Sequence, residues 1–167
     1  MAKPITYSEQ AARAIEILSK GAFLTAGSAA KANTMTIGWG AIGFMWGKPI
    51  FTVMVRPSRY TFAFIESVGE FTVSLPLGGM QASLNICGTQ SGRDTDKLAV
   101  AGLRLAPGQK VATPVVAGCG LYYECRVVYK QVMLPAAAGQ VKNQWYPEGN
   151  FHTLYFGEIV AAYMDDK

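Results

Sequence analysis

A basic turn with hydroxyl side chains is the part of this sequence best suited to binding an anion. It reads Arg56-Pro57-Ser58-Arg59-Tyr60-Thr61 and stands between an apolar segment, residues 50–55, and a predicted helix. Arginines form charge-assisted hydrogen bonds, and the first turn of a helix offers unpaired N–H groups at its positive dipole end. Ser58 is expected to cap this helix. Residues 56–61, the basic turn, therefore predict a phosphate site, although ordinary surface turns have a similar composition.

Few other residues offer chemistry of their own. The single histidine, His152, and the three scattered cysteines lack the spacing of a zinc site, and we predict no metal site. The sequence has no P-loop and no GxSxG motif, and no GxGxxG of the dinucleotide kind follows a predicted strand. A serine or cysteine nucleophile with His152 as its base stays open. The cysteines themselves are predicted to be small buried apolar residues.

Composition restricts the class of protein. The 167 residues suit a single domain, residues 1–167, and 50% hydrophobic with 16% charged residues predict a folded chain. The amino terminus lacks an apolar signal region and the apolar runs are too short to span a membrane, so we expect a cytoplasmic protein with no membrane association. The 15 basic residues against 11 acidic ones are spread along the chain, which predicts no nucleic-acid binding.

The elements that must position the basic turn are mainly strands. The capping-box spacing of Thr6 and Glu9 predicts a first helix that Gly21 ends. Strands are predicted at 22–27, 34–46, 50–55, 71–75, 121–134 and 152–163, and further helices at 60–68, 80–86 and 95–101. The Gly/Pro/Ala-rich stretches 105–120 and 135–139 are predicted loops. Because the strands do not alternate regularly with helices, the pattern favours a β-barrel with a few peripheral helices.

Two of these strands carry a more specific expectation. Residues 121–130 alternate between two sets of side chains, which predicts a half-buried strand whose second face meets water. Residues 50–55 are almost wholly apolar, which predicts a central strand that is covered on both faces.

The motifs together resemble the flavin reductase-like family, particularly its flavoredoxin branch. The resemblance covers nearly the whole chain. It is carried by Asn33-Thr34-Met35-Thr36-Ile37-Gly38-Trp39, by Lys48 to Val55 and the basic turn, and by the weaker echoes Cys87-Gly88, Ser91 to Lys97 and His152 to Val160. It implies a mainly β fold, an FMN-binding split β-barrel of Greek-key type, and a homodimer with the cofactor near the subunit interface.

The resemblance also implies roles for particular residues. The candidate FMN-binding residues are Asn33, Thr34, Met35 and Thr36 along the isoalloxazine edge, Arg56, Ser58, Arg59, Tyr60 and Thr61 at the phosphate, and Lys97 as a further phosphate or ribityl contact. Lys97 as a solvated helix residue is the alternative. Gly38 and Gly40 are expected to let the backbone approach a neighbour closely.

His152 is the candidate catalytic residue, because the resemblance places it near the flavin or the reduced nicotinamide. There it would orient the nicotinamide or hydrogen-bond to the flavin; a structural histidine is the alternative. Trp39 and Trp46 are expected to pack within the protein rather than stack on a flavin.

The leading hypothesis is an FMN-dependent flavin reductase, an NAD(P)H:FMN oxidoreductase that passes electrons to free flavin, iron or a partner protein. The alternative is a flavoredoxin-like electron carrier that has protein redox partners and little NAD(P)H activity. A related split barrel that binds haem or a phosphorylated vitamin is a third hypothesis, against which the basic turn favours FMN.

Overall fold

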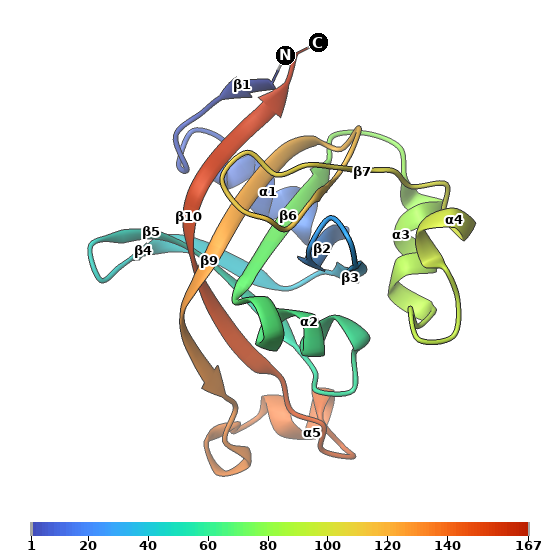
Figure 1. Cartoon of the computed structure of the whole chain (residues 1–167). Coiled ribbons are helices and arrows are strands. Elements are labelled where there is room, and N and C mark those ends of the chain that lie inside the picture. Colours follow the sequence, from blue (N-terminus) through green and yellow to red (C-terminus); the bar gives the residue numbers. More distant parts are fainter. Residues whose placement is uncertain (1, 167) are drawn as a thin grey trace.

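The computed structural model describes residues 2–166, which form a strongly twisted antiparallel sheet with helices at its margins (Figure 1). The strands are β1 (Ala2–Pro4), β2 (Ala22–Gly27), β3 (Ala32–Ile37), β4 (Gly40–Met45), β5 (Lys48–Val55), β6 (Glu70–Pro76), β7 (Leu105–Ala106), β8 (Val115–Val116), β9 (Gly120–Val132) and β10 (Thr153–Asp165). The helices are α1 (Ala11–Leu18), α2 (Tyr60–Val68), α3 (Gln81–Thr89), α4 (Lys97–Val100), α5 (Val141–Trp145) and the 3-10 turn η1 (Pro135–Ala137). No helix among residues 2–166 is long and apolar enough to cross a membrane.

The strand order is β3-β2-β6-β9-β10-β5-β4, with β1 added to β10 and a small separate ladder of β7 and β8. The two ends of this path, β3 and β4, follow each other in the chain and are separated only by Gly38 and Trp39. The barrel is therefore split between them. The predicted single strand 34–46 is wrong in this respect, because the chain leaves one edge strand and enters the other. The predicted mainly β barrel with peripheral helices is confirmed.

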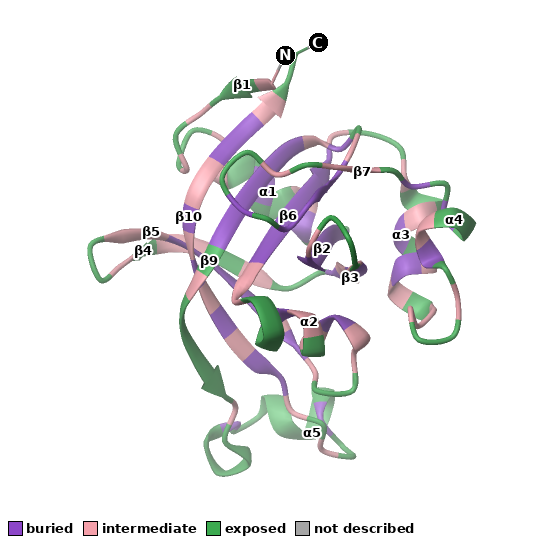
Figure 2. Ribbon diagram, in the orientation of Figure 1, coloured by how far each residue is buried: buried purple, intermediate pink, exposed green. Residues whose placement is uncertain are grey.

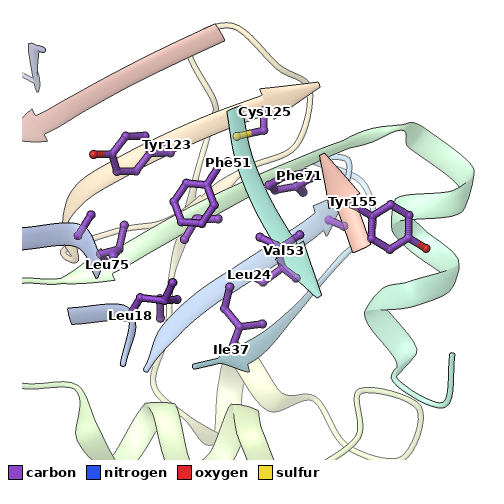
Figure 3. Close-up of a cluster of buried hydrophobic side chains, with 14 of the residues drawn as sticks. Leu18, Leu24, Ile37, Phe51, Val53, Phe71, Leu75, Tyr123, Cys125 and Tyr155 are labelled. Carbon is purple, nitrogen blue, oxygen red and sulfur yellow. The ribbon is translucent and has the colours of Figure 1, made fainter. Parts of the chain in front are cut away.

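The core lies inside the barrel and is filled by large side chains that alternate along the strands (Figures 2 and 3). Phe51, Val53, Phe71 and Tyr123 are fully buried there, and Leu18 of α1 packs against the same cluster. Five of the six residues of segment 50–55 are buried, so the prediction of a covered central strand is confirmed. Its place between β10 and β4 explains the lack of polar side chains.

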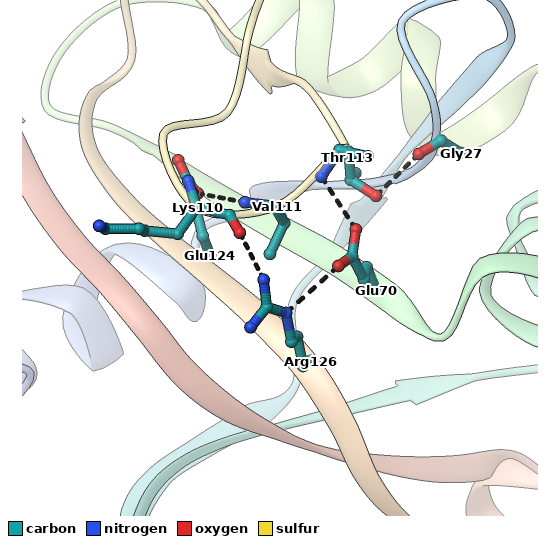
Figure 4. A network of polar contacts seen from close by, with 8 residues as sticks. Gly27, Glu70, Lys110, Val111, Thr113, Glu124 and Arg126 are labelled. Carbon is teal, nitrogen blue, oxygen red and sulfur yellow. Dashed lines mark hydrogen bonds and ion pairs between the residues drawn. The ribbon is translucent and has the colours of Figure 1, made fainter.

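The prediction that one face of β9 meets water is wrong for its first half. Tyr122 and Glu124 are buried, because the segment that carries β7 and β8 folds over this face. The Glu124 carboxylate accepts hydrogen bonds from the backbone N–H groups of residues 109–111 at 2.7, 2.7 and 3.2 Å, and from the Tyr163 hydroxyl at 2.7 Å. Figure 4 shows Glu124 beside Lys110 and Val111. Beyond Arg126 the strand is mostly exposed.

Element boundaries agree with the sequence where the local signals are strong. β2 and α2 occupy the predicted residues, and α3 and α4 lie within a few residues of their predicted positions. The capping box is only half formed: the Thr6 N–H donates to Glu9 Oε1 at 2.6 Å, but α1 starts later and Gln10 is its N-cap residue. The short elements β1, β7, β8, η1 and α5 were not predicted, since they are too brief to show periodicity.

Candidate functional site

Four neighbouring hollows follow β3 from its first residues to Trp39. The outer hollow, about 390 Å³, lies between the start of β3, α2 and residues 92–98. The basic hollow, about 90 Å³, lies between β3 and the basic turn. The strand hollow, about 210 Å³, extends along residues 35–39 to His152, and the apolar hollow, about 280 Å³, lies between Trp39 and α5. Each hollow shares at least one lining residue with the next, so the four adjoin one another in a row, which we call the groove.

The basic hollow brings together seven of the predicted residues: Asn33, Met35, Ser58, Arg59, Tyr60, Thr61 and Lys97. Asn33 Nδ2 donates to Thr61 Oγ1 at 2.7 Å, which joins β3 to the first turn of α2. Arg59 Nη1 donates to the Gly88 carbonyl at 3.1 Å, and Lys97 Nζ donates to the Cys87 carbonyl at 3.3 Å, both at the end of α3. Lys97 is buried, so the alternative of a solvated lysine is wrong. The shared backbone acceptors hold both cations at one wall.

The two cations in this hollow have no acidic partner among the described residues. The ion pairs of residues 2–166 join other side chains, and the nearest contacts of Arg59 and Lys97 are backbone carbonyls. Burial lowers the pKa of both groups, and the Arg59 charge lowers that of Lys97 further. Each retains N–H groups beyond those that its recorded bonds use. Lys97 is buried and Arg59 is half-buried, and a pair of such cations with spare donors and no acidic partner fits a bound anion.

Arg56 lies apart from Arg59, although both belong to the basic turn. Its guanidinium donates to the carbonyls of Trp145 at 2.9 Å and Asn150 at 3.1 Å and stacks on the Tyr146 ring at 4.8 Å. It lines the strand hollow rather than the basic hollow. The sequence therefore grouped two arginines that the structure separates: the chain turns between them, with the Arg59 N–H donating to the Arg56 carbonyl at 3.0 Å, and their guanidinium groups bond to different segments.

The hydroxyl of Ser58 does not cap α2, so that prediction is wrong. Arg59 is the N-cap residue, with an extended backbone at φ −75° and ψ 137°, and no side chain caps the helix. Ser58 Oγ instead accepts from Asn150 Nδ2 at 2.8 Å, and the Ser58 carbonyl accepts from Arg93 at 3.0 Å. These contacts tie the basic turn to the segments on either side of the groove.

Along the strand hollow, β3 offers its backbone more than its hydroxyls. Thr34 Oγ1 is 2.9 Å from Thr25 Oγ1, and Thr36 Oγ1 donates to the Leu84 carbonyl at 2.6 Å. Both hydroxyls therefore have protein partners. β3 is the last strand of the hydrogen-bonded path, so one edge of its backbone lacks a neighbouring strand. That edge can bind the polar rim of a flat ligand while Met35 lines the hollow.

His152 faces the strand hollow and has a buried ring. Its Nδ1 lies 2.6 Å from the Tyr146 hydroxyl, and its ring centroid lies 5.5 Å from that of Trp39. Burial, together with the Arg56 charge, lowers the pKa of His152 to about 4. The imidazole is therefore neutral at neutral pH, where it can orient or accept a hydrogen bond but cannot serve as a cationic acid.

Aromatic side chains form the far end of the groove. Trp39 is 39% exposed and meets Trp145 edge to face at 4.9 Å, so it lines the groove as well as packing there. Trp46 makes ring contacts with Tyr129 and Phe156 and is 59% exposed, so the expectation that it packs within the protein is met only in part. Sequence reasoning missed Trp145, Tyr146 and Met54. The only local signal for the first two was a pair of aromatic residues in a segment too short to predict as a helix.

Two further expectations can be placed in the structure. The backbone at Gly40 packs on the Thr52 carbonyl, 2.7 Å from where a Cβ would lie, so the close approach expected there is to β5 and not to a ligand. A Cβ on Gly38 would meet nothing nearer than the Leu18 carbonyl at 3.8 Å. Among residues 2–166, no three His, Cys, Asp or Glu side chains are placed to hold a metal ion.

Comparisons with known proteins match this fold to flavoproteins. An uncharacterized protein of Archaeoglobus fulgidus is 30% identical over 86% of this chain and 72% of its own length, and Escherichia coli YddH, also uncharacterized, is 29% identical over 81% and 64%. The structure of Methanosarcina acetivorans flavoredoxin has a TM-score of 0.69 and 29% identity over 87% of this chain and 68% of its own. A Shewanella baltica FMN-binding domain of flavin reductase-like enzymes has a TM-score of 0.70 and 23% identity over 99% and 78%. Residues 17–167 match the profile of the flavin reductase like domain, and the chain belongs to that family of flavin-binding oxidoreductases.

Proposed function

We propose that this chain binds FMN in the groove along β3 and acts as an NAD(P)H:FMN oxidoreductase, a flavin reductase. One observation carries the proposal: the basic hollow holds the buried Lys97 and the half-buried Arg59, neither with an acidic partner among residues 2–166, and it is followed along β3 by a hollow lined by a free backbone edge and aromatic rings. FMN has a phosphate and a flat conjugated ring joined by a polar chain, which match the basic hollow and the strand hollow in that order. The structurally similar domain from Shewanella baltica is an FMN-binding domain, which supports FMN as the ligand of this fold.

The residues fit the cofactor in a definite order. Arg59 and Lys97 would hold the phosphate, with Asn33 and Thr61 beside them. The backbone edge of β3 would hydrogen-bond to the carbonyls and nitrogens of the ring. The spare donors of Arg59 and Lys97 and the small size of the basic hollow support one phosphate group there.

The remaining side chains of the groove have supporting roles in this proposal. Bound FMN supplies hydride and single-electron chemistry. Trp39, Met54 and Trp145 line the apolar hollow, where they exclude water and leave room for the planar nicotinamide of NAD(P)H. The neutral His152, held by Tyr146, is placed to orient the nicotinamide or to hydrogen-bond to the flavin. Reaction then depends mainly on alignment.

A second candidate is a flavoredoxin-like carrier that uses the same cofactor but exchanges electrons with proteins. The 29% identity with the Methanosarcina acetivorans flavoredoxin favours it. In either function, exposed apolar side chains near the β4–β5 hairpin, including Phe44 and Trp46, support a contact with a second copy of the chain, and we propose a homodimer. For the reductase we propose free flavin, iron or a redox protein as the electron acceptor.

The test is anaerobic mixing of the FMN-loaded protein with NADH and, separately, NADPH, while the flavin absorbance is followed. Rapid bleaching by either nucleotide supports the reductase. If neither nucleotide changes the flavin spectrum but a reduced redox protein bleaches it, the result supports the carrier. A protein that binds no added FMN refutes both functions.

A further inference from the structure

The outer hollow continues the groove beyond the basic hollow and is not needed for FMN. The two hollows share Asn33, Tyr60 and Lys97, so they adjoin each other at the proposed phosphate position. The basic hollow, about 90 Å³, suits one phosphate, whereas the outer hollow, about 390 Å³, falls in the range of small-molecule sites. A ligand that fills both must extend past the first phosphate.

The walls of the outer hollow combine cations with aromatic rings. Tyr60 and Phe64 meet edge to face at 5.0 Å. The Arg93 guanidinium lies 5.0 Å from the Tyr60 ring, and Lys31 Nζ lies 6.0 Å from the Phe64 ring. Aromatic faces beside arginine and lysine bind nucleobases by stacking and phosphates by charge. This combination indicates a nucleotide rather than a simple anion.

The charges in the outer hollow also set an order along the ligand. Lys97 stands at the junction with the basic hollow, where a second phosphate would follow the first. Asp94 and Asp96 line the same hollow and would repel further phosphates, but their carboxylates accept hydrogen bonds from sugar hydroxyls. The favoured order is phosphate, then ribose, then base.

The loop that carries Arg93 is held closely against β3. A Cβ added at Gly92 would collide with Asn33 Oδ1 and lie 3.0 Å from the Tyr60 ring. Arg93 also donates to the Ser58 carbonyl at 3.0 Å. The wall is therefore fixed to the same residues that form the basic hollow.

We infer that the outer hollow binds the adenosine monophosphate half of FAD, so that this chain binds FAD more tightly than FMN. The inference rests on the proposed flavin site, because the phosphate in the basic hollow must be that of the flavin. The adenosine monophosphate half of NAD(P)H has the same chemistry. FAD is favoured because its second phosphate is bonded directly to the first, at the junction that the two hollows share.

The experiment measures dissociation constants of riboflavin, FMN and FAD by fluorescence in the wild-type protein and in two double variants. Lys31→Ala with Arg93→Ala removes two of the three cations that line the outer hollow and keeps Lys97, which also lines the basic hollow. Lys20→Ala with Arg13→Ala removes the same charges from exposed positions near α1, outside all four hollows. We expect the wild type to bind FAD about three- to tenfold more tightly than FMN, and only the first variant to lose that preference.

A second measurement does not depend on any variant. Saturating adenosine monophosphate should lower the affinity of the wild-type protein for FAD to that for FMN and leave the affinity for FMN unchanged. Equal affinity for FAD and FMN, equal weakening of both in the outer-hollow variant, or a raised KM for NADH with unchanged FAD binding would overturn the inference. The proposed function fails separately, if FMN itself does not bind.

Discussion

Replacing Lys97 by methionine should weaken FMN binding and stabilise the protein without ligand. The ammonium is buried, has no acidic partner among residues 2–166, and donates to a single recorded acceptor, the Cys87 carbonyl. Methionine keeps the unbranched shape and removes the charge. The phosphate of FMN would then lose a charge-assisted hydrogen bond, whereas riboflavin, which has no phosphate, would lose nothing.

The two effects have different magnitudes. A hydrogen bond to a charged group contributes about 1.5–3 kcal/mol, which predicts about a 10- to 150-fold weaker FMN affinity in Lys97→Met. Removing an uncompensated buried cation is expected to stabilise the ligand-free fold by about 1 kcal/mol or more, or a few degrees in Tm. Weaker FMN binding together with higher stability of the ligand-free protein would mark Lys97 as a binding residue. Replacing a structural lysine would instead lower both the stability and the affinity.

The assay is titration of FMN and riboflavin into wild type, Lys97→Met and the exposed control Lys142→Met, followed by flavin fluorescence, with thermal unfolding of each ligand-free protein. The expected result is an FMN-to-riboflavin affinity ratio that falls by at least about tenfold in Lys97→Met alone. A ratio that does not change, or a ligand-free Lys97→Met protein that melts well below wild type, would refute the assignment of Lys97 to an anion.

Three further perturbations test other parts of the structure. Arg59→Ala should weaken FMN binding by about tenfold or more relative to riboflavin binding, measured by the same titrations. Arg56→Ala should weaken both alike, and limited digestion should show faster proteolysis of residues 141–150, to whose carbonyls Arg56 donates. The pKa of His152 is about 4 in the folded chain against 6.5 when unfolded, so the unfolded state binds the proton first as pH falls. The free energy of unfolding in urea should therefore decline by about 2 kcal/mol between pH 6.5 and 4, after allowance for solvent screening. This decline should be smaller in His152→Gln. Glu124→Gln places an amide NH₂ among buried N–H donors and should lower the free energy of unfolding in urea by about 3 kcal/mol, while flavin affinity stays within about twofold. An unchanged stability would contradict the hydrogen-bond network around Glu124.

Strong local signals made several elements predictable from the sequence. The apolar run of β5 and the residues of α2 required only periodicity and turn chemistry. The ring of Tyr122 and the carboxylate of Glu124 were misplaced because alternation shows two faces and not what covers them. The cover comes from a distant loop that has almost no regular structure of its own.

The sequence by itself determined a mainly β chain, a basic turn at the start of a helix, and the order of motifs that mark the family. Only the tertiary structure decided which of these side chains meet. It sent Arg59 toward Lys97 and Arg56 toward α5, it buried Lys97, and it brought Tyr146 to His152. The physical reason is that hydrogen bonds and charges act over a few ångströms, and those separations between α3, α4, α5 and β3 are fixed by packing of residues far apart in the chain.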